Sequence, residues 1–422
     1  MEAGMRTLLK TCSKRAALLC AAACLLFSRG PAAAAPAAGE KLNVIIVSLD
    51  LLRADRLAAY GGGRNLAPNL DAFAGTAAVY LNAVSASGWT LPSAVSVFTG
   101  LYPLQHKISN IVSKTGQGGM ERSRLAPGIL TLAEVFKRRG YETASFAGGT
   151  AIWHNFGLER GFDLLRTDTS QKLAASFAQA QTWLQQRKGG KPFFAFIQGF
   201  DLLHWQNSPG PGAGGNGGPA AAAPSAADRV AAYDERVKAA DLAFGEFLAA
   251  LEKMGLRKKT VIVFLSHHGE GLGLDAHGPP LHAMSLYEEF IRVPLLIGRP
   301  GAAPAAIKRQ VSLLDVGPTV LAAAGLGEDK KFAEQTRRKP LYPFGAGEDG
   351  CRSAFSEIEA MYLTELVSLR ACSGWKLIYD FKNSTRQLYD LNKDPGEKKD
   401  VYAMEPEIAG RLEEELFDWL GQ

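Results

Sequence analysis

Apolar runs alternate with amphipathic stretches along most of the chain. The apolar runs are rich in β-branched residues and predict strands that are buried on both faces. The stretches between them place apolar residues every three or four positions, which predicts helices. The predicted strands are 42–49, 141–147, 193–199, 260–265 and 293–297, and the predicted helices are 132–139, 171–187, 237–254 and 314–324.

Strand and helix in alternation imply βαβ units, which predict an α/β fold with a mostly parallel sheet between two layers of helices. After about Gly325 the pattern changes to short strands and one final helix, which predicts a small antiparallel subdomain. We therefore expect an α/β domain over 41–328 and a C-terminal subdomain over 329–422. The C-terminal elements expected are strands at 353–357, 367–372, 375–380 and 387–391 and a helix at 405–420.

One segment inside the predicted α/β domain cannot contribute to a core. Residues 208–227 consist almost entirely of Gly, Pro, Ala and Ser. Such a composition predicts a flexible surface loop.

The first 38 residues have the layout of a secretory signal. Basic residues at positions 6, 10, 14 and 15 precede an apolar run over 16–27, and small residues follow over 31–38. This pattern is typical of a cleaved signal, and the apolar run is short for a membrane span. We expect an exported protein, periplasmic or secreted. The alternative is an uncleaved anchor that keeps the protein near a membrane.

Composition excludes some classes of function. The chain has 422 residues, of which 47% are hydrophobic, so a disordered chain is not expected. Five of its 47 basic residues and one of its 42 acidic residues precede Gly39, which leaves the rest of the chain with a net charge of +1. That balance gives no support for a nucleic-acid partner.

Two cysteines remain outside the signal, Cys351 and Cys372. An even number of cysteines in an oxidising compartment predicts a disulfide between them. The alternative is a pair of free, buried thiols.

Candidate reactive residues follow the predicted strands. Asp50 follows the strand at 42–49, and His267 and His268 follow the strand at 260–265. Thr90 lies before a helix that we expect to begin near Ala94, and a helix N-terminus favours an anion. In open α/β sheets, reactive groups gather beyond the carboxyl ends of the strands. Taken singly, each residue has an ordinary alternative as a helix cap, a turn former or a solvated side chain.

Ordered blocks of sequence carry a resemblance to a known family. They run from about Leu42 to Glu397, and their order resembles that of the sulfatase family in the alkaline phosphatase superfamily. The blocks are NVIIVSLDLLRADRLAAYG, APNLDAFA, SGWTLPSAVSVFTGLYP, TLAEVFKRRGYETASF, RGFD, YDERVKAADLAFGEFLAAL, FLSHHGEGLG, LYEEFIRVPLLI, SLLDVGPTVLAAAGL, WKLIYD and QLYDLNKDPGE.

The resemblance implies roles for individual residues. Asp50 matches a metal-binding carboxylate, and His268 matches the histidine of the family's Asp-His-Gly motif. Thr90 matches the nucleophile, which is Cys or Ser in formylglycine sulfatases and Thr in related lipid-headgroup transferases. His282 matches a later histidine that contacts the substrate or a second metal, and His204 resembles the family's mid-chain histidine. The implied metal ligands are Asp50, Thr90, His267 and His268.

The chain also departs from the family pattern. His267 stands where the family has Asp, Leu51 where a second carboxylate often follows, and Ala94 where an Arg is expected. The GGTAIWH segment at 148–154 lacks the family's Lys, and Trp205 follows His204. Because formylglycine forms from Cys or Ser, none is expected at Thr90. Two imidazoles with one carboxylate suit Zn²⁺ or Mn²⁺ better than Ca²⁺.

Three functions remain open at this point. The first is a hydrolase or transferase that acts on phosphate or sulfate esters of a small molecule, lipid or glycan, with Thr90 as nucleophile and His204 or His282 as acid–base. The second is a non-catalytic binding or scaffold protein with a degenerate metal site. The third is a sulfatase that uses Thr90 directly on sulfur.

Two further histidines, His106 and His154, are expected to lie either in the pocket or on the surface.

Overall fold

A computed structural model describes residues 41–63, 65–114, 120–148, 156–170, 172–203, 225–273, 277, 284–345, 350–360 and 364–421. The predicted signal, His154, His204, His282 and all but the last three residues of the predicted loop 208–227 lie outside these ranges. Within the described ranges, every helix is too short or too polar to span a bilayer.

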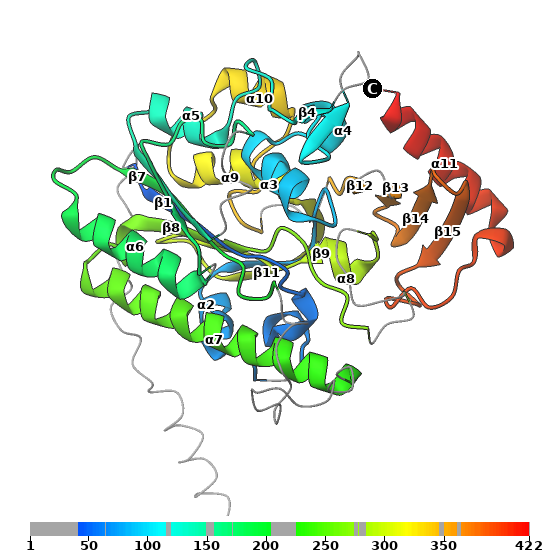
Figure 1. The fold of residues 1–422 in the computed structure, drawn as a ribbon, viewed down its shortest axis with the longest axis horizontal. Helices are drawn as coiled ribbons and strands as arrows, with labels where there is room; N and C mark the ends of the chain where they lie inside the picture. Colours follow the sequence, from blue (N-terminus) through cyan, green and yellow to red (C-terminus); the bar gives the residue numbers. More distant parts are fainter. Residues whose placement is uncertain are drawn as a thin grey trace, which may run out of the picture. The chain divides into compact units, whose positions relative to one another are not determined.

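The centre of the fold is a nine-stranded sheet with helices on both faces (Figure 1). Its strand order is β11-β2-β10-β8-β1-β7-β5-β6, with β9 paired to β2. Most neighbouring strands are parallel, so the predicted α/β class is confirmed. The strands are β1 (Asn43–Leu49), β2 (Ala78–Val84), β5 (Glu142–Gly148), β6 (Leu164–Asp168), β7 (Phe193–Gly199), β8 (Thr260–Leu265), β9 (Arg292–Val293), β10 (Leu295–Gly298) and β11 (Ala305–Ser312).

Strand β1 lies between the two helical layers, and its residues alternate between two cores. Val44 and Ile46 belong to one core, and Ile45 and Val47 belong to the other. Burying each such side chain stabilises the fold by roughly 1.5–3 kcal/mol. Helices α3 (Thr90–Thr99), α5 (Leu132–Arg138), α9 (Val316–Ala323) and α10 (Lys330–Thr336) contribute to the first core, and α2 (Pro68–Ala74), α6 (Leu173–Gln186) and α7 (Ala226–Lys253) to the second.

Several predicted boundaries were wrong. Pro294 has no N–H for a sheet hydrogen bond, and it divides the predicted strand 293–297 into β9 and an antiparallel β10. Helix α7 begins at Ala226 because Ser225 caps it, so the predicted loop ends earlier than residue 227. Helix α3 begins at Thr90 and not near Ala94. Three strands of the sheet were not predicted at all: β2, β6 and β11.

The C-terminal subdomain is a four-stranded antiparallel sheet covered by one helix, as predicted. Leu412 and Leu416 of the helix are buried against the sheet. A disulfide joins Cys351 and Cys372. The elements are β12 (Ala354–Ala360), β13 (Thr364–Arg370), β14 (Trp375–Asp380), β15 (Thr385–Asp390) and α11 (Pro406–Leu420).

The chain segment between the two sheets packs in part against the α/β core. Phe332 of α10 and Leu341 belong to the first α/β core, although both follow residue 329. Short elements complete the described chain. These are β3 (Val112–Lys114), β4 (Met120–Arg122), α4 (Pro103–His106), α8 (Glu288–Ile291) and the 3₁₀ turns at 54–56, 58–60, 257–259, 313–315 and 402–404.

Candidate active site

The strand ends meet at one edge of the central sheet. β1 and β8 are parallel neighbours, with Ser48 opposite Leu265, so Asp50 and His267 leave the sheet side by side. Ser85 follows β2, and its hydroxyl donates to the His267 carbonyl at 2.5 Å. The Ser93 hydroxyl donates to the same carbonyl at 2.8 Å. These bonds tie the first turn of α3 to the loop after β8.

Thr90 is the first residue of α3 and lies at the centre of the site. Its hydroxyl oxygen Oγ1 donates to Asp50 Oδ2 at 2.6 Å and lies 3.1 Å from His268 Nε2. His268 Nε2 is 3.8 Å from Asp50 Oδ1. The structure therefore brings together three of the residues singled out from the sequence. The position at a helix N-terminus adds free N–H groups and the positive end of the helix dipole.

The hydrogen bonds of His268 show which of its ring nitrogens carries the hydrogen and which one accepts. Nδ1 is 2.7 Å from the carbonyl oxygen of Gly269, and a carbonyl only accepts, so Nδ1 carries a hydrogen. In the neutral ring, Nε2 then presents a lone pair to Thr90. The one hydroxyl hydrogen of Thr90 cannot serve both this lone pair and Asp50 at once. The carboxylate of Asp50 and the lone pair of His268 Nε2 are therefore two alternative acceptors for the Thr90 proton, and both groups attract a cation.

His267 is buried deeply beside this cluster. Its side chain is fully enclosed, and within the described residues neither ring nitrogen has a hydrogen-bond partner. Leaving a buried polar group unsatisfied costs about 1–3 kcal/mol. Burial lowers the pKa of His267 to about 4; the charge of Asp50 opposes this shift, and the neighbouring His268 adds to it. The ring is therefore neutral at pH 7, with one nitrogen lone pair available to a ligand.

The turn that carries Asp50 has an unusual backbone. Leu51 has a φ of +65°, in the left-handed region, which costs a non-glycine residue about 1–3 kcal/mol. The Tyr233 hydroxyl donates to the Leu51 carbonyl at 2.7 Å and holds this conformation. The Ser266 hydroxyl accepts from the Leu52 N–H and donates to the His268 carbonyl. These contacts fix Asp50 and His268 relative to each other.

The sequence reasoning missed these positioning residues. Ser85, Ser93, Ser266 and Tyr233 act through backbone carbonyls and N–H groups. The only signal available was the presence of serines directly after two buried strands.

The donor set can be compared with the needs of a metal ion. Within the described residues, no three His, Cys, Asp or Glu side chains are gathered into a ready-made metal site. The residues singled out from the sequence supply one carboxylate, one hydroxyl and two imidazoles, and the His267 imidazole has no hydrogen-bond partner among the described residues. Such donors fit Zn²⁺ or Mn²⁺, whereas Ca²⁺ requires six to eight oxygens. The residues thus have suitable chemistry without a preformed cage.

Two other residues considered from the sequence belong to the core. His106 is buried, donates from Nε2 to Ser96 and accepts the Ile108 N–H at Nδ1. Burial lowers its pKa to about 3, so it is a neutral structural residue and lies neither in the pocket nor on the surface. Ala94 is buried in the first core, so α3 presents no cation there.

A further histidine escaped the sequence reasoning. His277 stacks on Tyr287, with ring centroids 3.7 Å apart. Its Nδ1 lies 2.8 Å from Glu289 Oε1, and its Nε2 donates to the Glu397 carbonyl at 2.8 Å. Burial acts to lower the pKa of His277, but the two glutamates outweigh it and raise the pKa. The LYEE block that contains Tyr287 and Glu289 was its only sequence signal.

The fold and this geometry have counterparts among known proteins. The model of the Sulfatase family matches residues 42–326, which is more than half of the chain. The chain therefore belongs to the sulfatase family. This agrees with the resemblance found from the ordered sequence blocks.

Among curated relatives, bovine arylsulfatase K is 30% identical over 192 residues, which cover 42% of this chain and 34% of that protein. The chain thus matches about a third of the length of the arylsulfatase K proteins. The Delta 4,5-hexuronate-2-O-sulfatase of Bacteroides thetaiotaomicron is 23% identical over 455 residues, covering 90% of this chain and 88% of that protein.

Solved structures share the fold along nearly the whole chain. A 2-O GAG sulfatase superposes with a TM-score of 0.75 at 20% identity, covering 90% of this chain and 92% of that one. The phosphonate monoester hydrolase of Agrobacterium radiobacter superposes with a TM-score of 0.70 at 19% identity, covering 90% and 95%. At these identities the likeness establishes the fold alone.

Proposed function

We propose that this sulfatase-family protein hydrolyses a phosphate or sulfate ester with Thr90 as the nucleophile. The observation that carries the proposal is the position of the Thr90 hydroxyl, within hydrogen-bond distance of both Asp50 and His268 at the start of α3. A hydroxyl with an adjacent proton acceptor is the arrangement that activates Ser and Thr nucleophiles. The curated relatives with sulfatase names and the phosphonate monoester hydrolase support ester hydrolysis.

The chemistry proceeds in two displacements. Thr90 Oγ1 attacks the phosphorus or sulfur, its proton passes to Asp50 or His268 Nε2, and the bond to the leaving alcohol breaks. Water then attacks the ester formed on Thr90 and restores the free hydroxyl. The leaving alcohol takes a proton from an acid, and His204 and His282 stay predictions for this role because both lie outside the described residues.

A divalent cation, when bound, would lower the pKa of the Thr90 hydroxyl and neutralise charge on the ester oxygens. Asp50, Thr90, His267 and His268 are the residues that would hold it, and Zn²⁺ or Mn²⁺ suits this donor set best. The buried ring nitrogens of His267, which have no hydrogen-bond partner among the described residues, support a ligand at this position.

The substrate class is an ester on a small molecule or glycan. Relatives named as acting on a hexuronate 2-O-sulfate and on GAG support the glycan. The protein is exported in this proposal, since residues 1–38 have the layout of a secretory signal and the structure contains a disulfide.

Turnover of aryl esters tests the proposal. Wild-type protein, Thr90→Ala and Thr90→Ser are assayed with an aryl phosphodiester, an aryl phosphonate and an aryl sulfate, with and without added Zn²⁺ or Mn²⁺. We expect turnover in the wild type, partial turnover in Thr90→Ser and none in Thr90→Ala. Equal turnover in wild type and Thr90→Ala would show that Thr90 is not the nucleophile.

A second candidate is a non-catalytic binding protein. Two observations favour it: Leu51 occupies a position where the family often has a carboxylate, and Ala94 replaces the expected arginine. Metal analysis separates the two candidates, because a stoichiometric ion supports the enzyme. No bound ion under any metal supply, together with no turnover, supports the binding protein.

A further inference from the structure

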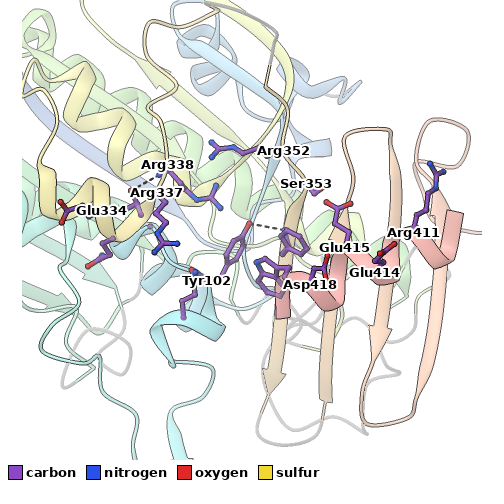
Figure 2. A pocket seen from close by; sticks show the side chains of 16 residues that line it. Tyr102, Glu334, Arg337, Arg338, Arg352, Ser353, Arg411, Glu414, Glu415 and Asp418 are labelled. Atoms are coloured by element: carbon purple, nitrogen blue, oxygen red, sulfur yellow. Dashed lines mark hydrogen bonds between the residues drawn. The ribbon is translucent and has the colours of Figure 1, made fainter. Parts of the chain in front are cut away.

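A cleft of about 880 Å³ lies between α10, β12 and α11, away from the Thr90 site (Figure 2). Gly100, the C-cap of α3, lines this cleft, whereas Thr90 begins the same helix. A ten-residue helix is about 15 Å long, so its two ends serve separate sites. A second hollow of about 530 Å³ adjoins the cleft and shares Arg337, Arg338 and Arg352 with it. Both volumes are in the range of ligand sites.

The second hollow carries a surplus of positive charge. Among the described residues, five basic side chains line it with a single carboxylate, Asp315. Asp315 Oδ1 is 2.9 Å from Arg338 and 3.5 Å from Arg352, so one negative charge is shared by two guanidinium groups. Arg337 and Lys339 are exposed and have no ion-pair partner within the described residues. The surplus charge is therefore available to an anion from solution.

The guanidinium group of Arg338 is held in place, and the backbone that carries Arg352 is anchored by the neighbouring disulfide. Arg338 lies over the ring of Tyr102, with 5.3 Å from its Cζ to the ring centroid, and its side chain is only 14% exposed. Arg352 follows Cys351, which is fixed by the disulfide. A guanidinium that is already positioned loses little entropy when it binds an oxyanion through two parallel hydrogen bonds.

The opposite wall of the cleft differs in charge. Glu414, Glu415 and Asp418 of α11 face the arginines across the cleft and outnumber Arg411 on the same helix, while Glu334 is the one described carboxylate on the side of the three arginines (Figure 2). The Trp419 ring lines the same wall and stacks on Phe355, with centroids 4.4 Å apart and an interplanar angle of 5°. Carboxylates accept hydrogen bonds from hydroxyls but repel phosphates, and a fixed aromatic ring offers an apolar surface.

This separation of charge selects among anionic ligands. A nucleic acid carries one charge on every nucleotide, so part of it would lie against the carboxylates of α11. A glycan with spaced sulfate or carboxylate groups places an anion at the arginines and hydroxyls at the acidic wall. The apolar face of a sugar ring fits beside Trp419.

We propose that the cleft defined by Arg337, Arg338, Arg352 and Trp419 is a second binding site that holds a segment of an anionic glycan outside the catalytic pocket. Such a site raises the effective concentration of a chain whose other segment enters the pocket. The binding itself stands independently of the chemistry proposed for Thr90.

Calorimetric titration tests the site with three probes: a dextran sulfate oligomer, the unsulfated dextran oligomer, and a single-stranded DNA oligomer of equal charge. The full-length wild type is compared with the Arg337→Ala/Arg352→Ala double variant. Lys258→Ala/Lys259→Ala is the matched control, because it removes two exposed charges from the turn before β8. We expect the double variant to bind dextran sulfate about tenfold more weakly or worse, and the control to change less than about twofold.

Binding of dextran sulfate is also expected to be unchanged in Thr90→Ala, which separates this proposal from that of ester hydrolysis. If the double variant melts early, Arg337→Ala alone replaces it, since this exposed side chain has no ion-pair partner among the described residues to lose. Its expected effect is about threefold to fivefold. Equal loss in the lysine control, equal binding of unsulfated dextran, or equally tight DNA binding would overturn the proposal.

Discussion

The two ends of helix α3 carry two different kinds of site. At its start, Thr90, Asp50, His267 and His268 are all buried, and Thr90 lies within hydrogen-bond distance of Asp50 and His268. At its end, Gly100 opens on a cleft whose charged side chains are largely exposed. Electrostatic interactions are strong in the buried site and screened by salt in the open one. The first therefore suits one small reacting group, and the second suits an extended ligand.

The largest expected effect concerns the buried end. Asp50→Asn removes the charge that accepts the Thr90 proton, so we expect kcat/KM for the aryl ester substrate to fall about 10³-fold. Dextran sulfate binding at the cleft should not change. Asp241→Asn is the matched control, because Asp241 is also buried but caps α2 through the N–H groups of Asn69 and Leu70. A similar loss in the control would show that the effect is on folding.

The next largest effect is the pH dependence of stability that His267 gives to the buried end. The pKa of His267 is lowered to about 4 from an ordinary value of 6.5, so the unfolded chain takes up a proton first as the pH falls. The free energy of unfolding should therefore decrease by about 3 kcal/mol between pH 6.5 and 4 through this residue. Urea unfolding of wild type and His267→Leu over this pH range isolates the contribution of His267 to the free energy of unfolding. An equal pH dependence in the two proteins would contradict it.

A smaller effect is expected from His267→Leu at neutral pH. Without metal, removing an unsatisfied buried imidazole should raise the free energy of unfolding by about 1–3 kcal/mol. The same change should weaken binding of Zn²⁺ or Mn²⁺. Urea unfolding in chelator and metal analysis after dialysis measure the two effects. A variant that is less stable without metal would show that the imidazole has an unrecognised partner.

The smallest effect concerns the open end. Cys351→Ser/Cys372→Ser frees the segment that carries Arg352, so dextran sulfate affinity should fall about threefold. Ester turnover should not change, because the two cysteines line hollows whose lining does not include Thr90, Asp50 or His268. Titration and turnover are measured on the same preparations. Loss of turnover with unchanged affinity would reverse the proposed division between the two ends.

Parts of the fold followed from local patterns. The strands β7 and β8 have the predicted bounds, because each contains a continuous apolar run, at 193–197 and 261–265. The missed strands β6 and β11 include charged residues such as Arg166 and Lys308, which weakened the apolar signal. The break at Pro294 and the early start of α7 depend on single residues within longer patterns.

The candidate sites differ in how far a sequence can define them. Asp50, Thr90 and His268 were identified because each is close to a recognisable motif. The anchoring of the His267 carbonyl by Ser85 and Ser93 joins segments that are distant in sequence, so no local pattern marks it. The cleft defined by Arg337, Arg338, Arg352 and Trp419 combines residues from the end of α10, from the segment before β12 and from α11. These segments are brought together by the fold, so no local pattern predicts the cleft.

In the proposed reaction, Thr90 receives the phosphoryl or sulfuryl group of the ester. The most direct test mixes the full-length protein with excess aryl phosphate or sulfate ester during turnover, quenches it in acid and analyses its peptides by mass spectrometry. We expect one phosphoryl or sulfuryl group on Thr90 in the wild type and none in Thr90→Ala. Turnover with the group on another residue, or turnover that persists in Thr90→Ala, would contradict it.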